Sequence, residues 1–496
     1  MPGVRTPSQA APPPVDAVRA SWGAWIDGRE SPPAGGQEIA VVDPSFGGVV
    51  CGAARGGAAD VDRAVAAARA ALPAWAELPV ARRRRLLIDA ADRIAAHAET
   101  LAVLETSSSG KPLRESRQDA LKCAEAFEFY SGVADKLFGR SIPISPEYLN
   151  YTIREPIGVT AHIVPWNFPL RLAVRSVAPA LAAGNTVVLK PAEQTPLSVL
   201  HLGQVLAEAG LPAGVYNVVP GYGPEAGAAL SGHPGINQLS FTGSMPTGIQ
   251  VMQAAARNVV PVTLELGGKS PNIVFADADF DYALAGVSKA IFTNAGQVCL
   301  AGTRLLLQEA AYDAFVAKLV ERTARLSVGP GIDDPDMGPL ISEPQRRRVL
   351  EYIDIGRGEG AEVLIGGGVP DSPRCAQGYF VEPTLLHNVT NAARVAREEI
   401  FGPVLTILRF RDEEEAVRLA NDSDYGLVAG VWTSNLDRAH KVAARLQAGQ
   451  VFINDYFSGS VASPFGGYKR SGFGRERGLE AMEHYTQVKS VCARLR

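Results

Sequence analysis

The sequence has no run of apolar residues long enough to cross a membrane, since a spanning helix needs roughly eighteen. Its formal net charge is only −4 over 496 residues, so it lacks the positive excess that would attract nucleic acid or an anionic membrane. Its five cysteines are odd in number and scattered, and no pair of them has metal-site or disulfide-framework spacing. We therefore expect no metal, a reducing compartment and a cytoplasmic location.

The size and composition predict more than one globular domain. The chain is 46% hydrophobic and 20% charged, as in ordinary globular proteins. Residues 1–17 contain Pro12-Pro13-Pro14 and small polar residues, without the apolar core of a secretory signal, and we expect a flexible tail. A transit peptide is an alternative because no acid precedes Asp16, but the prolines oppose the amphipathic helix that such peptides form.

The segment from Ile157 to Phe241 repeats a strand followed by a helix. This alternation predicts an α/β fold with a parallel sheet, crossover helices and ligands at the carboxyl ends of the strands. The expected strands are 157–164, 186–190, 215–219 and 237–241, and the expected helices are 170–183, 196–209 and 224–231. A second α/β unit follows Gly268, with a strand at 272–275 and a helix at 280–292.

Three segments lie before this alternation. Residues 60–72 and 81–104 have helical spacing of their apolar residues. The arginines at 82–85 favour a solvated helix face or pairs within the chain over a nucleic-acid or lipid site. Residues 149–154 alternate apolar and polar residues and predict a half-buried strand.

Cys299 is the first candidate for chemistry. It lies three residues after Gly296 and three before Gly302, between an apolar helical segment (283–292) and an apolar strand segment (304–307). A nucleophilic cysteine needs a lowered pKa and an electropositive, partly open setting. The alternative is an inert cysteine in a core.

Two further candidates lie upstream of Cys299. Glu265 is flanked by leucines and followed by Gly267-Gly268; it is either a solvated acid at a strand end or a carboxyl in an apolar wall, with a raised pKa that suits it to activate water. Asn167 lies between Pro165 and Pro169, which fix the backbone around an amide that can donate to an oxyanion.

Five motifs in order resemble the aldehyde dehydrogenase superfamily, in its hydrolytic, NAD-dependent form. The resemblance covers the chain from about Trp22 to the C-terminus and implies a Rossmann-type cofactor domain, a second α/β catalytic domain and a β-arm for oligomerisation. The motifs are Pro165-Trp-Asn-Phe-Pro169, Leu264-Glu-Leu-Gly-Gly-Lys269, Gly296-Gln-Val-Cys299, Glu398-Glu-Ile-Phe-Gly-Pro403 and Pro464-Phe-Gly-Gly-Tyr-Lys469.

The resemblance implies a division of the chain and an oligomer. The implied units are an NAD-binding domain (18–138 and 157–266), an oligomerisation arm (139–156 and 479–496) and a catalytic domain (267–478). A homodimer or homotetramer is expected, with a small aldehyde as substrate and neither nucleic acid nor a membrane as partner.

NAD is the expected cofactor. Glu193, after the second strand of the alternation, would bind a free ribose 2′-hydroxyl and repel a 2′-phosphate. The segment from Gly221 to Gly227 is one residue longer than the usual dinucleotide fingerprint, as in this family. An NADP-preferring semialdehyde dehydrogenase is the nearest alternative. The implied cofactor residues are Ile163, Val164, Pro165, Trp166, Lys190, Glu193, Gly223, Gly227, Phe241, Gly243, Ser244, Leu266, Glu399 and Phe401.

The resemblance also implies a mechanism. Cys299 attacks the aldehyde, Asn167 and the Cys299 N–H stabilise the oxyanion, hydride passes to NAD, and water activated by Glu265 hydrolyses the thioester. Superfamily members that transfer the acyl group to coenzyme A lack this glutamate, so Glu265 favours hydrolysis. A non-catalytic protein on this fold, such as some crystallins, is disfavoured because all three residues are present. No histidine lies near Cys299 to support a cofactor-free hydrolase.

The implied substrate tunnel is mostly apolar. Arg175 lies eight residues after Asn167, as does the arginine that binds the substrate carboxylate in succinate semialdehyde dehydrogenases. Those enzymes have a second arginine, and the residue at its position here is Thr293. Arg175 pairing with a structural carboxylate is an equal alternative. An aromatic aldehyde or a semialdehyde would fit. Besides Phe292 and Thr293, the implied tunnel residues are Phe168, Leu172, Arg175, Val298, Leu300, Phe457 and Phe465.

Overall fold

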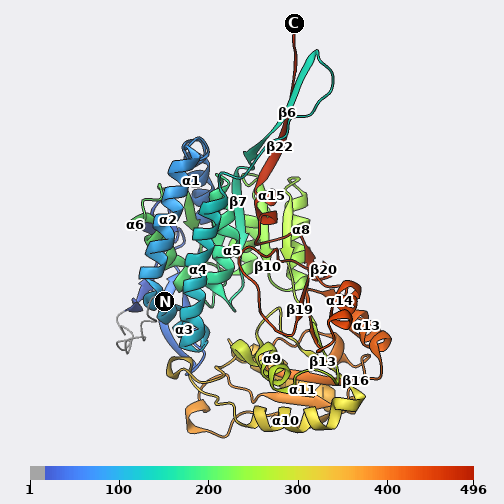
Figure 1. The fold of residues 1–496 in the computed structure, drawn as a ribbon. Coiled ribbons are helices and arrows are strands. Elements are labelled where there is room, and N and C mark those ends of the chain that lie inside the picture. Colours follow the sequence, from blue (N-terminus) through green and yellow to red (C-terminus); the bar gives the residue numbers. More distant parts are fainter. Residues whose placement is uncertain (1–16) are drawn as a thin grey trace, which may run out of the picture.

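The structure is a computed structural model that describes residues 17–496. The predicted flexible tail therefore lies outside the described residues, except for Ala17. Two large sheets, each covered by helices, form the body of the molecule (Figure 1). Within residues 17–496, no helix is both long and apolar enough to cross a bilayer.

The first sheet has eight strands in the order β21-β11-β10-β7-β8-β9-β2-β3. Its five central strands, β11 to β9 in this order, are parallel to one another, which confirms the prediction from the strand–helix alternation. β21 at one edge pairs antiparallel to β11, and β2 and the edge strand β3 add two antiparallel pairings beside β9. The bounds are β2 Ala24–Ile26, β3 Arg29–Ser31, β7 Val159–Ile163, β8 Thr186–Lys190, β9 Tyr216–Val218, β10 Gln238–Thr242, β11 Val262–Glu265 and β21 Gly472–Phe473.

Helices pack around this sheet and bury its central strands. Every residue of β7, β8 and β10 is buried, as expected for parallel strands covered on both faces. The single helix predicted at 81–104 was wrong, because the chain forms two helices that meet at His97. The bounds are α1 Ala58–Ala76, α2 Val80–Ala96, α3 Ala98–Ser109, α4 Leu113–Val133, α5 Pro169–Ala182, α6 Leu197–Glu208, the π-helical turn η2 Gly223–Gly227, α7 Ala228–Ser231 and α8 Met245–Ala256.

The second sheet has seven strands in the order β14-β15-β16-β13-β12-β18-β19, all parallel except β14. This confirms the second α/β unit. Its strands are β12 Pro271–Val274, β13 Arg304–Gln308, β14 Glu362–Ile365, β15 Thr384–His387, β16 Val404–Phe410, β18 Val428–Trp432 and β19 Gln450–Ile453. The helices of this part are α9 Phe280–Phe292, α10 Tyr312–Ala324, α11 Glu343–Gly358, α12 Arg394–Arg397, α13 Glu413–Asn421 and α14 Leu436–Arg445.

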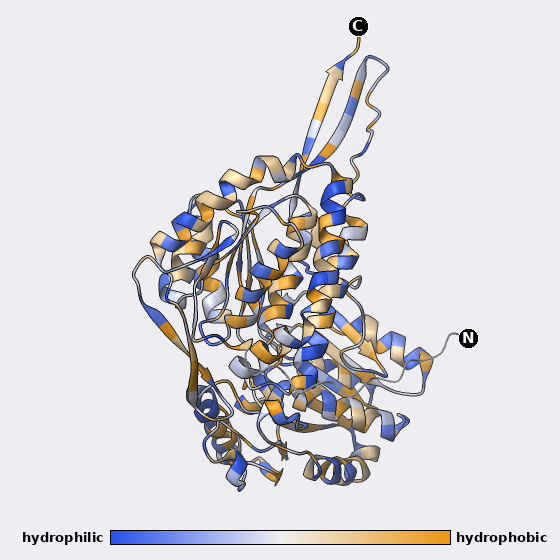
Figure 2. Cartoon of the chain, turned by 90° about the vertical axis from the view of Figure 1, so that its left-hand side faces the viewer, coloured by the Kyte–Doolittle hydropathy of each residue, from blue (hydrophilic) through white to orange (hydrophobic). Residues whose placement is uncertain are grey.

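A two-stranded antiparallel arm projects from the body beside the C-terminus (Figure 1). It consists of β6 (Tyr148–Pro156), which contains the predicted strand, and β22 (Thr486–Arg494). Apolar residues occur on both strands, away from the core (Figure 2), and Leu149, Ile153 and Val488 are exposed. The domain boundaries implied by the resemblance stay a prediction. The remaining elements are β1 Ser21–Trp22, β4 Glu38–Asp43, β5 Gly48–Ala54, β17 Tyr425–Gly426, β20 Tyr468–Lys469 and α15 Glu480–His484.

Candidate active site

Cys299 follows α9 through a tight left-handed turn. Asn294, Ala295 and Gly296 have φ angles of 48°, 52° and 71°, so the chain reverses directly after the helix ends. Gly302 N then donates to the Ala290 carbonyl at 3.1 Å, which ties the chain back to α9 before β13 begins. The thiol is half-buried and lines a cavity of about 490 Å³. The predicted presentation of a thiol between a helix and a strand is confirmed.

The pKa of Cys299 moves opposite to the expected direction. Burial raises the pKa of the thiol to about 11, and the carboxyls of Glu265 and Glu399 add to the rise. Arg175 and Arg477 oppose it but do not reverse it. Burial therefore outweighs the two arginines, and the lowered pKa that a nucleophilic cysteine needs is not found here.

Glu265 is the last residue of β11, between strands β10 and β21. Its side chain is 2% exposed, and neither carboxyl oxygen bonds to a described residue. Burial raises the pKa of Glu265 well above the usual carboxyl value, and Arg175 only partly opposes this. The predicted rise is confirmed, and a buried carboxyl with two free oxygens can accept hydrogen bonds from a water.

Asn167 is fixed against the loop that carries Cys299. Its Nδ2 donates to the Gln297 carbonyl at 2.9 Å, and its own carbonyl accepts from Asn294 Nδ2 at 3.0 Å. A side-chain amide has two N–H donors, so one remains beside the cysteine loop. The Cys299 N–H donates to no described residue. Two donors are thus available near the thiol.

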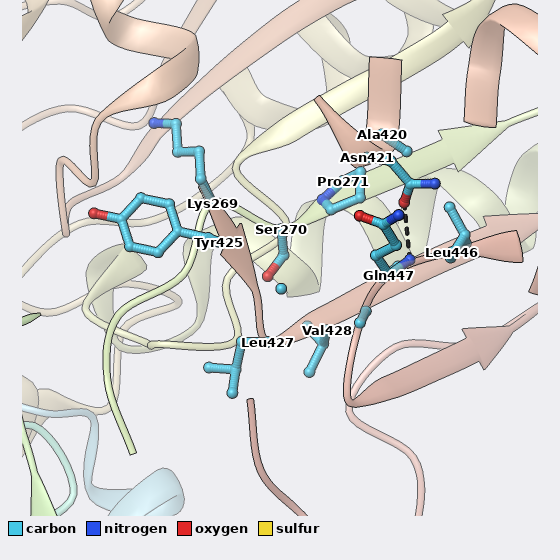
Figure 3. Close-up of a pocket in the computed structure, with 13 residues that line it drawn as sticks. Lys269, Ser270, Pro271, Ala420, Asn421, Tyr425, Leu427, Val428, Leu446 and Gln447 are labelled. Atoms are coloured by element: carbon cyan, nitrogen blue, oxygen red, sulfur yellow. Dashed lines mark hydrogen bonds between the residues drawn. The ribbon is translucent and has the colours of Figure 1, made fainter. Parts of the chain in front are cut away.

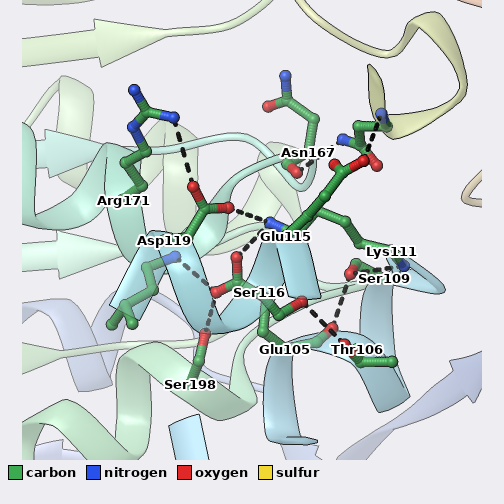
Figure 4. Close-up of polar contacts among 12 residues, drawn as sticks. Glu105, Thr106, Ser109, Lys111, Glu115, Ser116, Asp119, Asn167, Arg171 and Ser198 are labelled. Atoms are coloured by element: carbon green, nitrogen blue, oxygen red, sulfur yellow. Dashed lines mark hydrogen bonds and ion pairs between the residues drawn. The ribbon is translucent and has the colours of Figure 1, made fainter. Parts of the chain in front are cut away.

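A buried ionic network lies beside Asn167 and the start of α5 (Figure 4). Lys111 Nζ is 2.5 Å from Glu105 Oε1 and 2.6 Å from Asp119 Oδ2. Glu105 Oε2 accepts from Leu170 N, in the first turn of α5, at 3.2 Å. A buried charge is stable only when it is paired and hydrogen-bonded, so the bond from Leu170 to Glu105 fixes where α5 begins. Asn167 lies two residues before that start.

The expected cofactor residues gather at the carboxyl ends of neighbouring strands. Ile163 ends β7 and residues 164–166 follow it, Lys190 ends β8, 243–244 follow β10 and Leu266 follows β11. Two motifs far apart in the sequence meet there, since the Trp166 and Phe401 rings are 5.3 Å apart, edge to face. Glu399 Oε1 accepts from Gly268 N at 3.1 Å, in the same region.

The local structure at these strand ends fits a dinucleotide. No atom lies within 4 Å of the position that a side-chain Cβ would take at Gly223 or Gly227. A ligand can therefore approach the backbone of η2. Lys190 Nζ is buried and 3.3 Å from Glu193 Oε2. Ser244 is the N-cap residue of α8, but its side chain accepts no hydrogen bond from the helix backbone. The N–H groups at the start of α8 can therefore bind an anion.

The cavity beside Cys299 is lined by most of the residues expected for a substrate tunnel. Phe465 is not among them, because it is 1% exposed and packs behind two arginines, Arg175 and Arg477, each 5.1 Å from its ring centroid. The expected residues that do line the cavity are Phe168, Leu172, Arg175, Phe292, Thr293, Val298, Leu300 and Phe457.

Arg175 is engaged within the protein. Its guanidinium forms an ion pair with Glu476, and its NH2 donates to Thr242 Oγ1 at 3.0 Å. Glu476 Oε1 also accepts from Ser240 Oγ at 2.8 Å. Pairing with a structural carboxylate, the alternative stated from the sequence, is therefore present.

Sequence reasoning missed Arg477, which also lines the cavity. Of the motif at 464–469, only Phe465 was expected to line the substrate tunnel, and Arg477 lies eight residues beyond the end of that motif. The signal that would have found Arg477 is a second arginine two residues after Arg475, within the last basic cluster before the C-terminal arm.

Lys269 is a buried cation without a partner. Its side chain is 1% exposed, and Nζ bonds to no described residue. Lys269 borders a cavity of about 10 Å³ beside Asn421 and Gln447, from which its Nζ points away (Figure 3). Burial, with Arg304, lowers the pKa of Lys269 to about 7, so its charged form destabilises the fold.

Replacing Lys269 with methionine is expected to raise the melting temperature. The unfolded chain binds a proton at Lys269 between pH 7 and 10.5 and the folded chain does not, so the stability of the wild type rises with pH by roughly 1.4 kcal/mol per pH unit at most. The advantage of Lys269→Met over the wild type should therefore shrink from pH 7 to pH 9. Scanning fluorimetry at several pH values measures this.

Lys111→Met is the matched control. It leaves two buried acids unpaired and should lower stability by about 3 kcal/mol or more. If both variants raised the stability, or both lowered it, the interpretation of Lys269 as a buried cation without a partner would be contradicted.

Comparison with known proteins places this geometry in a family. A family model described as "Aldehyde dehydrogenase family" matches residues 31–491. An aldehyde dehydrogenase of Enchytraeus buchholzi is 47% identical over 465 residues, 92% of this chain and 93% of its own. Retinal dehydrogenase 2 of Homo sapiens is 45% identical over 466 residues, 93% of this chain and 89% of its own. The NAD+ complex of an aldehyde dehydrogenase from Bacillus cereus superimposes with a TM-score of 0.95 at 43% identity, covering 98% and 99% of the two chains.

Proposed function

Because the chain belongs to the aldehyde dehydrogenase family and oxidises an aldehyde with NAD, we propose that Cys299, Glu265 and Asn167 carry out the reaction. The observation that carries this proposal is that Asn167 and Glu265 both lie near the Cys299 thiol. Asn167 is bonded to Gln297, two residues before the cysteine, and the Glu265 carboxyl lies close enough to the thiol to raise the pKa of Cys299.

In the first stage the Cys299 sulfur bonds to the aldehyde carbon. The carbonyl oxygen becomes an oxyanion, which accepts hydrogen bonds from Asn167 Nδ2 and the Cys299 N–H. A donor of this kind is typically worth about 3 kcal/mol, or roughly a hundredfold in rate. When bound, NAD supplies the acceptor for the hydride that leaves the carbon. The carbon remains on Cys299 as a thioester.

In the second stage Glu265 takes a proton from a water, which then adds to the thioester carbon. The carbon–sulfur bond breaks, the carboxylate is released and Cys299 is restored. The raised pKa of Glu265 suits this role, since a general base works best with a pKa near the working pH. Coenzyme A has no part in this scheme.

The test is a balance of products. With coenzyme A omitted, the purified protein should form one carboxylate for each NADH, followed by NADH absorbance and chromatography of the acid. NADH without carboxylate, or turnover only after coenzyme A is added, would contradict hydrolysis at Cys299.

We assign the cofactor contacts from the strand ends. Lys190 and Glu193 would hold the adenosine ribose, and the start of α8 at Ser244 the pyrophosphate. Glu399 and Phe401, which meet the loop after β7 and Gly268, would bind the nicotinamide end. The support is the open backbone at Gly223 and Gly227 and the position of Lys190 and Glu193 at the carboxyl end of β8, where Glu193 is partly exposed.

Glu193→Gln is expected to weaken the preference for NAD. Removing this carboxylate removes the repulsion of a 2′-phosphate, so kcat/KM with NADP should rise relative to NAD by about tenfold. The same substitution at Glu321, an exposed acid on α10 in the other layer, is the control. An unchanged ratio would reject the role of Glu193.

We also propose that the protein forms a homodimer or a homotetramer through the arm. The β6–β22 arm leaves Leu149, Ile153 and Val488 exposed, and a second copy would cover them. Light scattering of the purified protein tests this, and a monomer at micromolar concentration would reject it.

The five free cysteines favour a reducing compartment, and we assign the cytoplasm.

A further inference from the structure

Arg477 is held rigidly at the wall of the cavity that contains Cys299. Its φ angle is 61°, a left-handed conformation that a non-glycine residue adopts at a cost. The neighbouring backbone enforces it. Phe465 and Glu476 exchange two backbone hydrogen bonds of 2.6 and 2.7 Å, and Gly478 N donates to Val461 O at 2.8 Å. Glu476 therefore faces Arg175, whereas Arg477 faces the cavity.

The guanidinium of Arg477 has no anionic partner. Within residues 17–496 it makes no hydrogen bond and no ion pair, and its only polar contact is with the face of the Phe465 ring. Burial, with Arg171 and Arg175, lowers the pKa of Arg477 to about 9, so it still carries its charge at neutral pH. Burying part of an unpaired charge costs free energy, and an anion in the cavity would recover it.

Three of the other arginines that line the cavity are already engaged, among them Arg114, which pairs with Asp334. Arg175 pairs with Glu476, and Arg171 is 3.3 Å from Asp119 Oδ1. Two further cations of the lining, Lys289 and Arg322, are exposed, and neither forms an ion pair among the described residues. More basic than acidic side chains line the cavity, and such a lining attracts anionic substrates.

Apolar side chains form another part of the cavity wall. Phe168, Leu172 and Phe457 line the cavity together with Cys299. A ligand that fits both features has a hydrocarbon middle and a negative end. A carboxylate matches the planar guanidinium, which can donate two parallel hydrogen bonds to it.

We propose that the substrate is an aldehyde with a carboxylate at the far end of the molecule, and that Arg477 is the specificity residue that binds this carboxylate. The inference rests on the proposed function of Cys299, because it assumes that the carbonyl lies at that thiol. Arg477 takes the role that the sequence suggested for Arg175, since Arg175 would have to leave Glu476 and Thr242 to fill it.

The first test compares matched aldehydes. The wild type should oxidise succinate semialdehyde and glutarate semialdehyde with a kcat/KM at least about tenfold above butanal and pentanal. Arg477→Gln should lose this preference through KM, with butanal changed less than about twofold, and Arg477→Lys should keep part of it. Arg325→Gln, which removes an exposed cation at the end of α10 outside the cavity lining, is the matched control and should change neither class by more than about twofold.

The second test needs no turnover. Glutarate, an unreactive dicarboxylate, should bind the wild type at least about tenfold more tightly than Arg477→Gln in calorimetry. Equal affinities, or a wild type without preference for the semialdehydes, would overturn the inference. In that case, NAD-dependent oxidation of butanal would leave the proposed function intact. Glutarate binding through Arg477 without oxidation of any aldehyde would instead reject the function and keep the anion site.

Discussion

Cys299→Ala is expected to abolish NADH formation, with a fall of at least about 10⁴-fold in kcat/KM for every aldehyde. Without the sulfur no covalent intermediate forms, and loss of a nucleophile typically costs this much or more. NADH absorbance measures the rate, and circular dichroism checks that the fold is kept.

Cys51→Ala is the matched control, because Cys51 is a free cysteine in β5 outside the cavity. It should keep its activity. Retention of more than about a hundredth of the activity by Cys299→Ala would reject the nucleophile.

The rate at which Cys299 reacts with an alkylating reagent is also expected to depend on pH. The thiol pKa of about 11 means that the thiolate fraction rises about tenfold per pH unit from pH 7 to pH 9. Alkylation of Cys299 by iodoacetamide, followed by mass spectrometry without cofactor, should rise accordingly. A plateau below pH 8 would show a lowered pKa instead.

The second large effect is expected for Glu265→Gln. The first stage does not use this carboxyl, so one equivalent of NADH should form quickly. Steady turnover should then fall by about 10² to 10⁴-fold, the usual range for a lost general base. Stopped-flow absorbance resolves the two phases.

Intact mass spectrometry should find the acyl group on Cys299 of this variant, and added hydroxylamine should restore turnover by attacking the thioester. An acyl-free protein with a uniformly slow first turnover would mean that Glu265 acts before the thioester forms. In the wild type, steady turnover should rise with pH as Glu265 loses its proton, above the usual range of a carboxyl.

The regular elements could be predicted because their signals are local. The strand at 186–190 and the helix at 280–292 have the predicted bounds. The break at His97 could not be predicted from apolar spacing, because apolar residues continue on both sides. The His97 ring instead contacts His201 and Glu208 on α6, more than 100 residues away.

The site was predictable only in part for the same reason. Cys299, Glu265 and Asn167 stand in short motifs that can be recognised in the sequence. The Arg175–Glu476 pair joins residues 301 positions apart, and no local pattern links them. The pKa of Cys299 depends on the sum of burial and four charges, which only the folded arrangement determines.

The strand that ends in Glu265 is completed by the far end of the chain. Leu264 and Glu265 pair with Phe473 and Gly472 of β21, and Leu266 N donates to Ser471 O at 3.0 Å. During synthesis, β11 therefore remains an open sheet edge until more than 200 further residues have been added. An open edge can pair with another chain, so a nascent or truncated protein that ends before Ser471 exposes an aggregation-prone strand at its own catalytic centre. Binding of a chaperone to stalled chains of increasing length should fall once the ribosome has released β21.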